Sequence, residues 1–181
     1  QLIQLDSSPA MFASLEKGGC DAAVLTMPSF FVAEERGFRT LADPADMDIY
    51  YLQNTVDSTR SYLRANRSQA VRFVKGLIEG IAYFKKYKKE SLDVLQKKLR
   101  IQSSQEKNIR YLEASYNLLA TKYYNQVPYA TPKAIETSLE FVAAEDSKAK
   151  NADAKLFVDD SIVREIETSG FIKQLYDTEY R

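Results

Sequence analysis

Histidine and tryptophan are absent from this chain of 181 residues, and it contains a single cysteine, Cys20. Without histidine there is no imidazole for a Ser-His-Asp triad, a Cys-His dyad or a His-ligated zinc site. One cysteine excludes an intramolecular disulfide and a cluster of thiolate ligands. An excess of positive charge is also lacking, because 25 Lys and Arg oppose 25 Asp and Glu. This balance disfavours binding to nucleic acid or to an anionic membrane.

Long apolar runs are missing as well. No stretch approaches the ~18 uninterrupted apolar residues that a membrane-spanning helix needs. The first twenty residues also lack the basic start, the apolar run and the small-residue cleavage site of a signal peptide. The sequence therefore predicts no targeting or membrane segment within these residues.

Residues 1–45 have the pattern of alternating strands and helices. Apolar runs at 2–5, 22–25 and 38–41 are typical of strands, and two helical segments separate them. The first helix follows Ser8-Pro9, an N-cap with proline in the first turn, and ends at Gly18-Gly19. The order predicts a right-handed β-α-β crossover in a short parallel sheet.

The run Ala22-Ala23-Val24-Leu25 carries most of this prediction. A continuous apolar run is typical of a strand that is buried on both faces of a parallel sheet. Only the runs 2–5 and 38–41 are available as its neighbours, which makes a thin sheet. We therefore expect either that these residues belong to a longer α/β chain or that oligomerisation supplies the missing neighbours.

The chain after residue 46 is predicted to be mostly helical. Residues 48–59 have extended character, either as a strand or as a connection, and helical spacing begins at Tyr62. Val71, Val74, Ile78 and Ile81 follow one helical stripe. Further signals are the capping-box pairs Asn66 with Gln69 and Ser103 with Glu106, the cap Thr131-Pro132, and Asp160 before a last helix. The lysines at 85–86 and 88–89 are expected to form a solvated helix face.

Several segments in order resemble the substrate-binding proteins of ABC transporters in the nitrate, sulfonate, taurine and thiamine-precursor group. The first is Ser8-Pro9-Ala10-Met11-Phe12 with the turn Gly18-Gly19-Cys20-Asp21-Ala22-Ala23, which is similar to that family's helix-then-strand pattern. The other matching segments are 37–43, 60–66, 82–85, 127–129 and 157–172. Their order and spacing extend over nearly the whole chain.

This resemblance implies an α/β fold like that of a periplasmic binding protein of the second type, in which two lobes close around a ligand. It implies that residues 1–45 are the later half of the second lobe. Residues 46–181 would be the return crossing and the helical C-terminal part of the first lobe. The family's first strands and first crossing have no counterpart here, so the expected fold is incomplete.

The candidate ligand-binding residues lie in three places. Parallel α/β sheets bind ligands beyond the carboxyl ends of their strands, at loops and helix N-termini. These positions and the resemblance select Ser7, Ser8, Thr26, Met27, Pro28, Ser29, Asn54 and Thr55. Each has a plainer interpretation, because Ser8 also suits an ordinary N-cap and Asn54 and Thr55 suit a connecting segment.

Other reactive side chains receive structural interpretations. Cys20 is expected to be buried and inert, and Asp21 to stabilise a Gly-Gly-Cys-Asp turn rather than act as a catalytic carboxylate. The neighbours Asp159 and Asp160 are better explained by helix capping than by metal binding. We therefore predict no catalytic residue, metal or cofactor.

The sequence leaves three functions open. The first, implied by the resemblance, is a non-catalytic solute-binding component of an ABC importer, located in the periplasm or outside the cytoplasmic membrane. Its partners would be a sulfonate, nitrate or pyrimidine ligand and a membrane permease. The second is an interaction module that self-associates as a homo-oligomer. The third, an enzyme resembling thiamine-pyrimidine synthase, is disfavoured because that chemistry consumes an active-site histidine.

Overall fold

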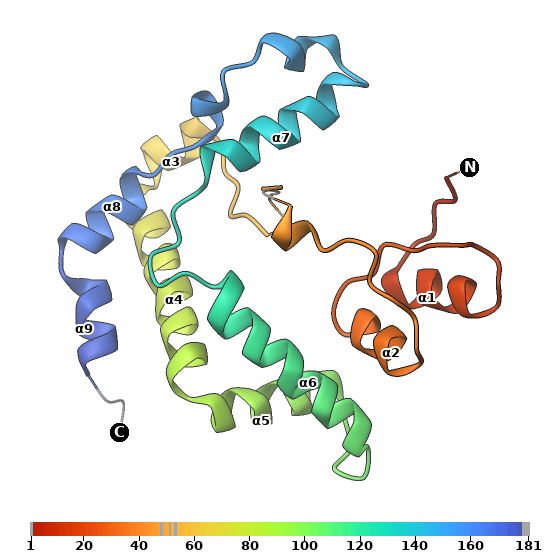
Figure 1. Ribbon diagram of the computed structural model, residues 1–181. Coiled ribbons are helices and arrows are strands. Elements are labelled where there is room, and N and C mark those ends of the chain that lie inside the picture. The colour runs from red at the N-terminus through yellow and green to blue at the C-terminus, as the bar shows by residue number, and fades with distance from the viewer. Residues whose placement is uncertain (1, 48, 51, 53, 179–181) are drawn as a thin grey trace. The chain divides into compact units, whose positions relative to one another are not determined.

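The computed structural model of the chain describes residues 2–47, 49–50, 52 and 54–178, and these residues are predominantly helical (Figure 1). The α-helices are α1 (Ser8–Glu16), α2 (Ser29–Glu35), α3 (Arg60–Ala65), α4 (Arg67–Lys86), α5 (Lys88–Leu99), α6 (Glu106–Leu118), α7 (Pro132–Ala143), α8 (Ser161–Thr168) and α9 (Phe171–Asp177). Short 3-10 helices are η1 (Pro44–Asp46), η3 (Ser147–Asn151) and η4 (Ala154–Phe157), and a π-helical turn η2 (Leu119–Tyr123) follows α6.

The prediction of an α/β fold with a parallel sheet is wrong. Residues 2–47, 49–50, 52 and 54–178 contain no β-strand, and the apolar runs 2–5, 22–25 and 38–41 have no regular secondary structure. Val24 is 80% exposed and Leu41 79% exposed, so neither run is buried on both faces. An apolar run becomes a strand only when a neighbouring backbone pairs with it, and these runs have no such neighbour among the described residues.

The region expected to be extended at 48–59 is only partly described, because positions 48, 51 and 53 lie outside the described residues. Its other residues form no strand either, and α3 begins at Arg60. The helical segments expected elsewhere are present, although single helices often differ from the prediction at their ends. The helical region expected from Tyr62 onward begins with two helices, α3 and α4, which meet at Asn66, where the sequence predicted a helix start.

The chain divides into two compact units. The first contains residues 1–42 and 88–123, and the second contains residues 43–87 and 124–181. The family resemblance implied a boundary between two lobes at residue 45. That boundary stays a prediction.

In the first unit, α1 and α2 lie against each other (Figure 1). Phe12 of α1 is buried, and its ring contacts the edge of Phe38 at a centroid distance of 6.0 Å. Arg36 lies over the Phe12 ring at 5.4 Å and also pairs with Glu16 at the end of α1. Aromatic packing and an ion pair thus join the two short helices.

Glu35 at the end of α2 links this helix pair to α6 within the same unit. Its carboxylate lies 3.2 Å from Lys107 Nζ and 3.4 Å from Arg110 Nη2, and it accepts a hydrogen bond from the Tyr111 hydroxyl. These three donors occupy the first turns of α6, which itself pairs with α5. The partly exposed Glu35 carboxylate therefore joins α2 to α6, which lie far apart in the sequence, through several polar contacts.

The second unit is built on the apolar stripe of α4. Helices α8 and α9 lie along α4 (Figure 1). Ile78 and Ala82 of α4 are fully buried in one cluster with Ile166, which is 1% exposed, and Ile172. The stripe expected through Val71, Val74 and Ile78 is confirmed, since all three belong to this core or pack against it. Ile81 is only partly buried, and Ala82 continues the stripe instead.

The adjacent lysines at the end of α4 are not a solvated face. Lys85 Nζ donates a hydrogen bond to the carbonyl of Tyr124 at 2.7 Å, and Lys86 Nζ donates to the carbonyl of Leu175 at 2.9 Å. Lys86 also reaches the carbonyl of Thr178 beyond the end of α9. An ammonium group at the last carbonyls of a helix stabilises that end of the helix dipole. The two lysines therefore fasten two remote segments to α4.

Three predicted helix caps differ in detail. Asn66 makes no side-chain cap to α4, because its amide nitrogen donates to the carbonyl of Tyr62 in the preceding helix. Ser103 does not cap α6, which begins after Gln105. At α8 the capping carboxylate belongs to Asp159, which accepts from the Ser161 N–H at 3.0 Å, whereas Asp160 makes no side-chain cap. Capping, as predicted for this aspartate pair, is thus carried out by the first of the two.

Truncating the second unit's core tests its packing. Ile166→Ala should lower the free energy of unfolding by about 2–5 kcal/mol, because it removes a fully buried side chain and leaves a cavity. Leu156→Ala is the matched control, since Leu156 is 59% exposed and belongs to the same unit, and it should change that free energy by less than about 0.5 kcal/mol. Urea unfolding followed by circular dichroism measures both. Equal effects of the two variants would contradict the described core.

A buried phenol in α9 gives a second test. The Tyr176 hydroxyl is buried and has no hydrogen-bond partner among the described residues, and burial raises the pKa of this phenol. Tyr176→Phe should therefore raise the free energy of unfolding by up to about 1 kcal/mol, since it removes an unsatisfied polar group.

The raised pKa of Tyr176 also predicts that the free energy of unfolding falls at alkaline pH. Because the pKa of Tyr176 is raised in the folded state, its contribution is complete below the unfolded pKa of about 10 and is lost as pH rises through the folded pKa. Unfolding free energies measured between pH 8 and 11 should fall less steeply for Tyr176→Phe than for the parent. A steeper fall in Tyr176→Phe would refute this assignment.

Candidate functional site

The hydroxyl of Ser8 joins two of the predicted ligand-binding loops. Its oxygen accepts a hydrogen bond from the Thr26 N–H at 2.9 Å, and it lies 3.4 Å from the Thr26 carbonyl, to which it donates. The two residues are eighteen positions apart in the sequence. Ser8 opens α1 and Thr26 lies just before α2, so this contact brings together the beginnings of two helices.

The first loop is fixed by helix capping. Ser7, not Ser8, is the N-cap of α1, and its hydroxyl accepts from the Ala10 N–H at 3.3 Å. Because Ser7 supplies the cap, the Ser8 side chain is available for the contact with Thr26. Pro9 follows in the first turn, as the sequence predicts, where its missing N–H costs no hydrogen bond.

The second loop, Thr26 to Ser29, is held by backbone contacts. The Thr26 carbonyl accepts from the Phe30 N–H at 3.3 Å, and the Pro28 carbonyl accepts from the Phe31 N–H at 3.1 Å. Ser29 is only 6% exposed and Met27 is half-buried, whereas Pro28 is exposed and follows a cis peptide bond. The six predicted residues of the first unit therefore lie in two loops that contact each other through Ser8.

Asn54 and Thr55 belong to the second unit, and both are exposed. The Thr55 hydroxyl donates a hydrogen bond to the Asp57 carboxylate at 2.9 Å, a residue that the sequence analysis did not single out. Their contact with a ligand shared with the first unit stays a prediction. What the structure adds is that Thr55 orients a carboxylate.

The other reactive side chains that the sequence analysis considered are Cys20, Asp21, Asp159 and Asp160. No group of three or more His, Cys, Asp or Glu side chains in the part of the chain that the structure describes has an arrangement that would hold a metal ion. Cys20 is half-buried rather than buried, and Asp21 is exposed. Asp159 has a pKa below the ordinary value because the Ser161 hydroxyl and N–H both donate to its carboxylate. This shift reflects helix capping.

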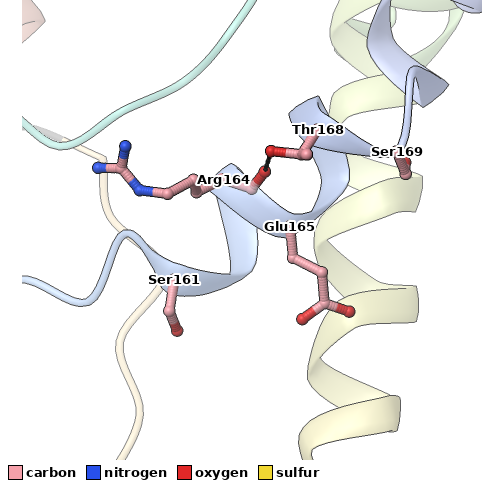
Figure 2. Close-up of a pocket in the computed structure, with 5 residues that line it drawn as sticks. All are labelled: Ser161, Arg164, Glu165, Thr168 and Ser169. Carbon is pink, nitrogen blue, oxygen red and sulfur yellow. Dashed lines mark hydrogen bonds between the residues drawn. The ribbon is translucent and has the colours of Figure 1, made fainter.

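The side chains that line a shallow pocket on α8 do not point toward one common position. The pocket is lined by Ser161, Arg164, Glu165, Thr168 and Ser169, and Figure 2 shows these side chains pointing to different sides of one helix. The Thr168 hydroxyl donates to the Arg164 carbonyl at 2.7 Å, and the Ser169 hydroxyl donates to the Ile166 carbonyl at 2.6 Å (the first bond is dashed in Figure 2). Both hydroxyls are engaged by their own helix, so they do not form a site.

No described helix is both long enough and apolar enough to cross a membrane. Comparison with known proteins gives no relative of this chain. No family model, curated protein or solved structure matches it. The resemblance to importer binding proteins therefore stays a prediction, and the Ser8–Thr26 loop pair is the strongest candidate site on geometric grounds.

Proposed function

We propose that the chain is a non-catalytic solute-binding component of an ABC importer that takes a small sulfonate, nitrate or pyrimidine at the loops around Ser8 and Thr26. Its location would be periplasmic or extracytoplasmic, and its protein partner a membrane permease. The observation that supports this proposal is the pair of hydrogen bonds between Ser8 and Thr26. These bonds join the two loops that the sequence predicts as binding loops.

The chemistry of the loops suits a small polar solute. Both loops precede helices, and α1, the longer of the two, has the partial positive charge of a helix N-terminus. Such a terminus favours an anionic or electron-rich group, and serine and threonine hydroxyls accept or donate as the ligand requires. Ser29 is almost fully buried at the start of α2, so the second loop has a well-defined position for one hydroxyl group.

A second candidate, self-association, is favoured by the exposure of large apolar side chains. Leu2 is fully exposed, and Val24 and Leu41 are each about four-fifths exposed in segments without regular structure. Monomeric proteins rarely expose many such side chains together, and a second copy would remove them from water. Under this candidate the chain is a stable homo-oligomer and the Ser8–Thr26 contact has only a structural role.

Binding of a defined ligand panel to the whole chain tests the proposal. Ethanesulfonate, nitrate and a 4-aminopyrimidine should be titrated by calorimetry and by thermal unfolding. One of them should bind, and at about 100 times its Kd it should stabilise the folded chain by about 2.7 kcal/mol. Ser8→Ala should weaken that binding at least about tenfold, because the two loops lose the contact that joins them.

Ser103→Ala is the control for that experiment, since Ser103 is an exposed serine of the same unit far from α1 in sequence. It should bind like the parent, and circular dichroism should show that both variants keep their helices. Absence of binding by all three ligands, together with a stable dimer in light scattering, would instead favour self-association. Unchanged binding in Ser8→Ala would remove Ser8 from the site.

A further inference from the structure

A second pocket lies within the second unit, between α7 and the segment that follows it. Its volume is about 470 Å³, within the range of ~300–1,000 Å³ that is usual for small-molecule sites. Ile135, Leu139 and Val142 line it from one face of α7, and Ala149, Ala152 and Phe157 line it from the opposite side. These side chains give the pocket a mainly apolar surface.

The packing of η3 and η4 against α7 explains why this apolar surface exists. Ile135, Leu139 and Val142 follow the three- and four-residue spacing of one helix face, and η3 and η4 fold back against α7. The hydroxyl of Ser138, between them, donates to the Ala134 carbonyl at 2.9 Å and is thus engaged by its own helix. Val142 and Phe157 remain 51% and 61% exposed, so the apolar surface is open to a ligand.

Two opposite charges also line this pocket. Asp57 reaches it from the segment before α3, and its carboxylate is held by the Thr55 hydroxyl at 2.9 Å. Lys148 lies in η3, where the Asp146 carboxylate accepts from its backbone N–H at 2.9 Å and fixes that turn. Within the described residues neither Asp57 nor Lys148 forms an ion pair. An apolar surface thus carries one available carboxylate and one available ammonium group.

We propose that this pocket binds a small zwitterion with an apolar body, of which a free amino acid with an aromatic side chain is the simplest case. The ammonium group of the ligand pairs with Asp57 and its carboxylate with Lys148, while its apolar body contacts Leu139, Val142 and Phe157. A purely apolar molecule would leave both charges unmatched, and an ion of one sign would match only one. Because both charges are solvent-exposed, the expected dissociation constant is on the order of a millimolar.

The test compares three ligands that differ by one charged group. L-phenylalanine carries both charges, phenethylamine lacks the carboxylate, and 3-phenylpropionate lacks the ammonium group. NMR titration of the whole chain should show saturable binding of phenylalanine and about three- to fivefold weaker binding of each analogue, because each analogue loses one exposed ion pair.

Single substitutions assign each charge. Asp57→Asn should weaken phenylalanine binding about three- to fivefold but leave 3-phenylpropionate binding unchanged. Lys148→Met should weaken phenylalanine binding to a similar extent but leave phenethylamine binding unchanged. Lys150→Met is the matched control, because Lys150 is an exposed lysine of the same turn that does not line the pocket. It should bind phenylalanine like the parent.

Several results would overturn the proposal. These are an absence of saturable phenylalanine binding, equal binding of all three ligands, or phenylalanine binding that neither Asp57→Asn nor Lys148→Met reduces. Ser8→Ala should retain phenylalanine binding, since Ser8 belongs to the other unit. Loss of phenylalanine binding in that variant would also count against this pocket. The experiments can therefore contradict the proposal for this pocket without contradicting the importer proposal, and the reverse.

Discussion

The hydrogen bonds between Ser8 and Thr26 are the constraint on which the first unit's candidate site depends. They connect the start of α1 to the loop before α2, eighteen positions later in the sequence. The bond satisfies the Thr26 N–H, which lies at the end of an apolar run that has no partner strand. A serine side chain thus fixes the end of a segment that a neighbouring strand would fix in a sheet.

The second unit depends on a different interaction, the burial of the α4 stripe against α8 and α9. This stripe follows from the spacing of Val71, Val74 and Ile78, which is why its position could be predicted from the sequence. Ala82, which completes it, is too small to give a clear signal. The fastening of remote carbonyls by Lys85 and Lys86 could not be predicted, because adjacent lysines usually mark a solvated face.

Helices were therefore more predictable than the sheet, for a physical reason. A helix satisfies its hydrogen bonds locally, so the Ser8-Pro9 signal located the start of α1 to within one residue, although Ser7 is the cap. The apolar composition of the run at 22–25 is the same whether the run forms a strand or stays unpaired. Only the presence of a neighbouring strand determines which conformation it adopts. The two candidate sites also differ in how far the sequence could predict them. The loops at Ser8 and Thr26 were predicted from strand ends, which the described residues lack, and from helix starts, which are present. Asp57 and Lys148 are brought to one pocket only by the fold.

Amide hydrogen exchange at Thr26 tests the central claim most directly, because that N–H is the donor to the Ser8 hydroxyl. In the parent chain the Thr26 amide should exchange at least about tenfold more slowly than in Ser8→Ala. The Ala10 amide, which donates to the Ser7 hydroxyl, should exchange at the same rate in both. A Thr26 amide that exchanges equally fast in the parent and in Ser8→Ala would contradict the loop pair and the site built on it.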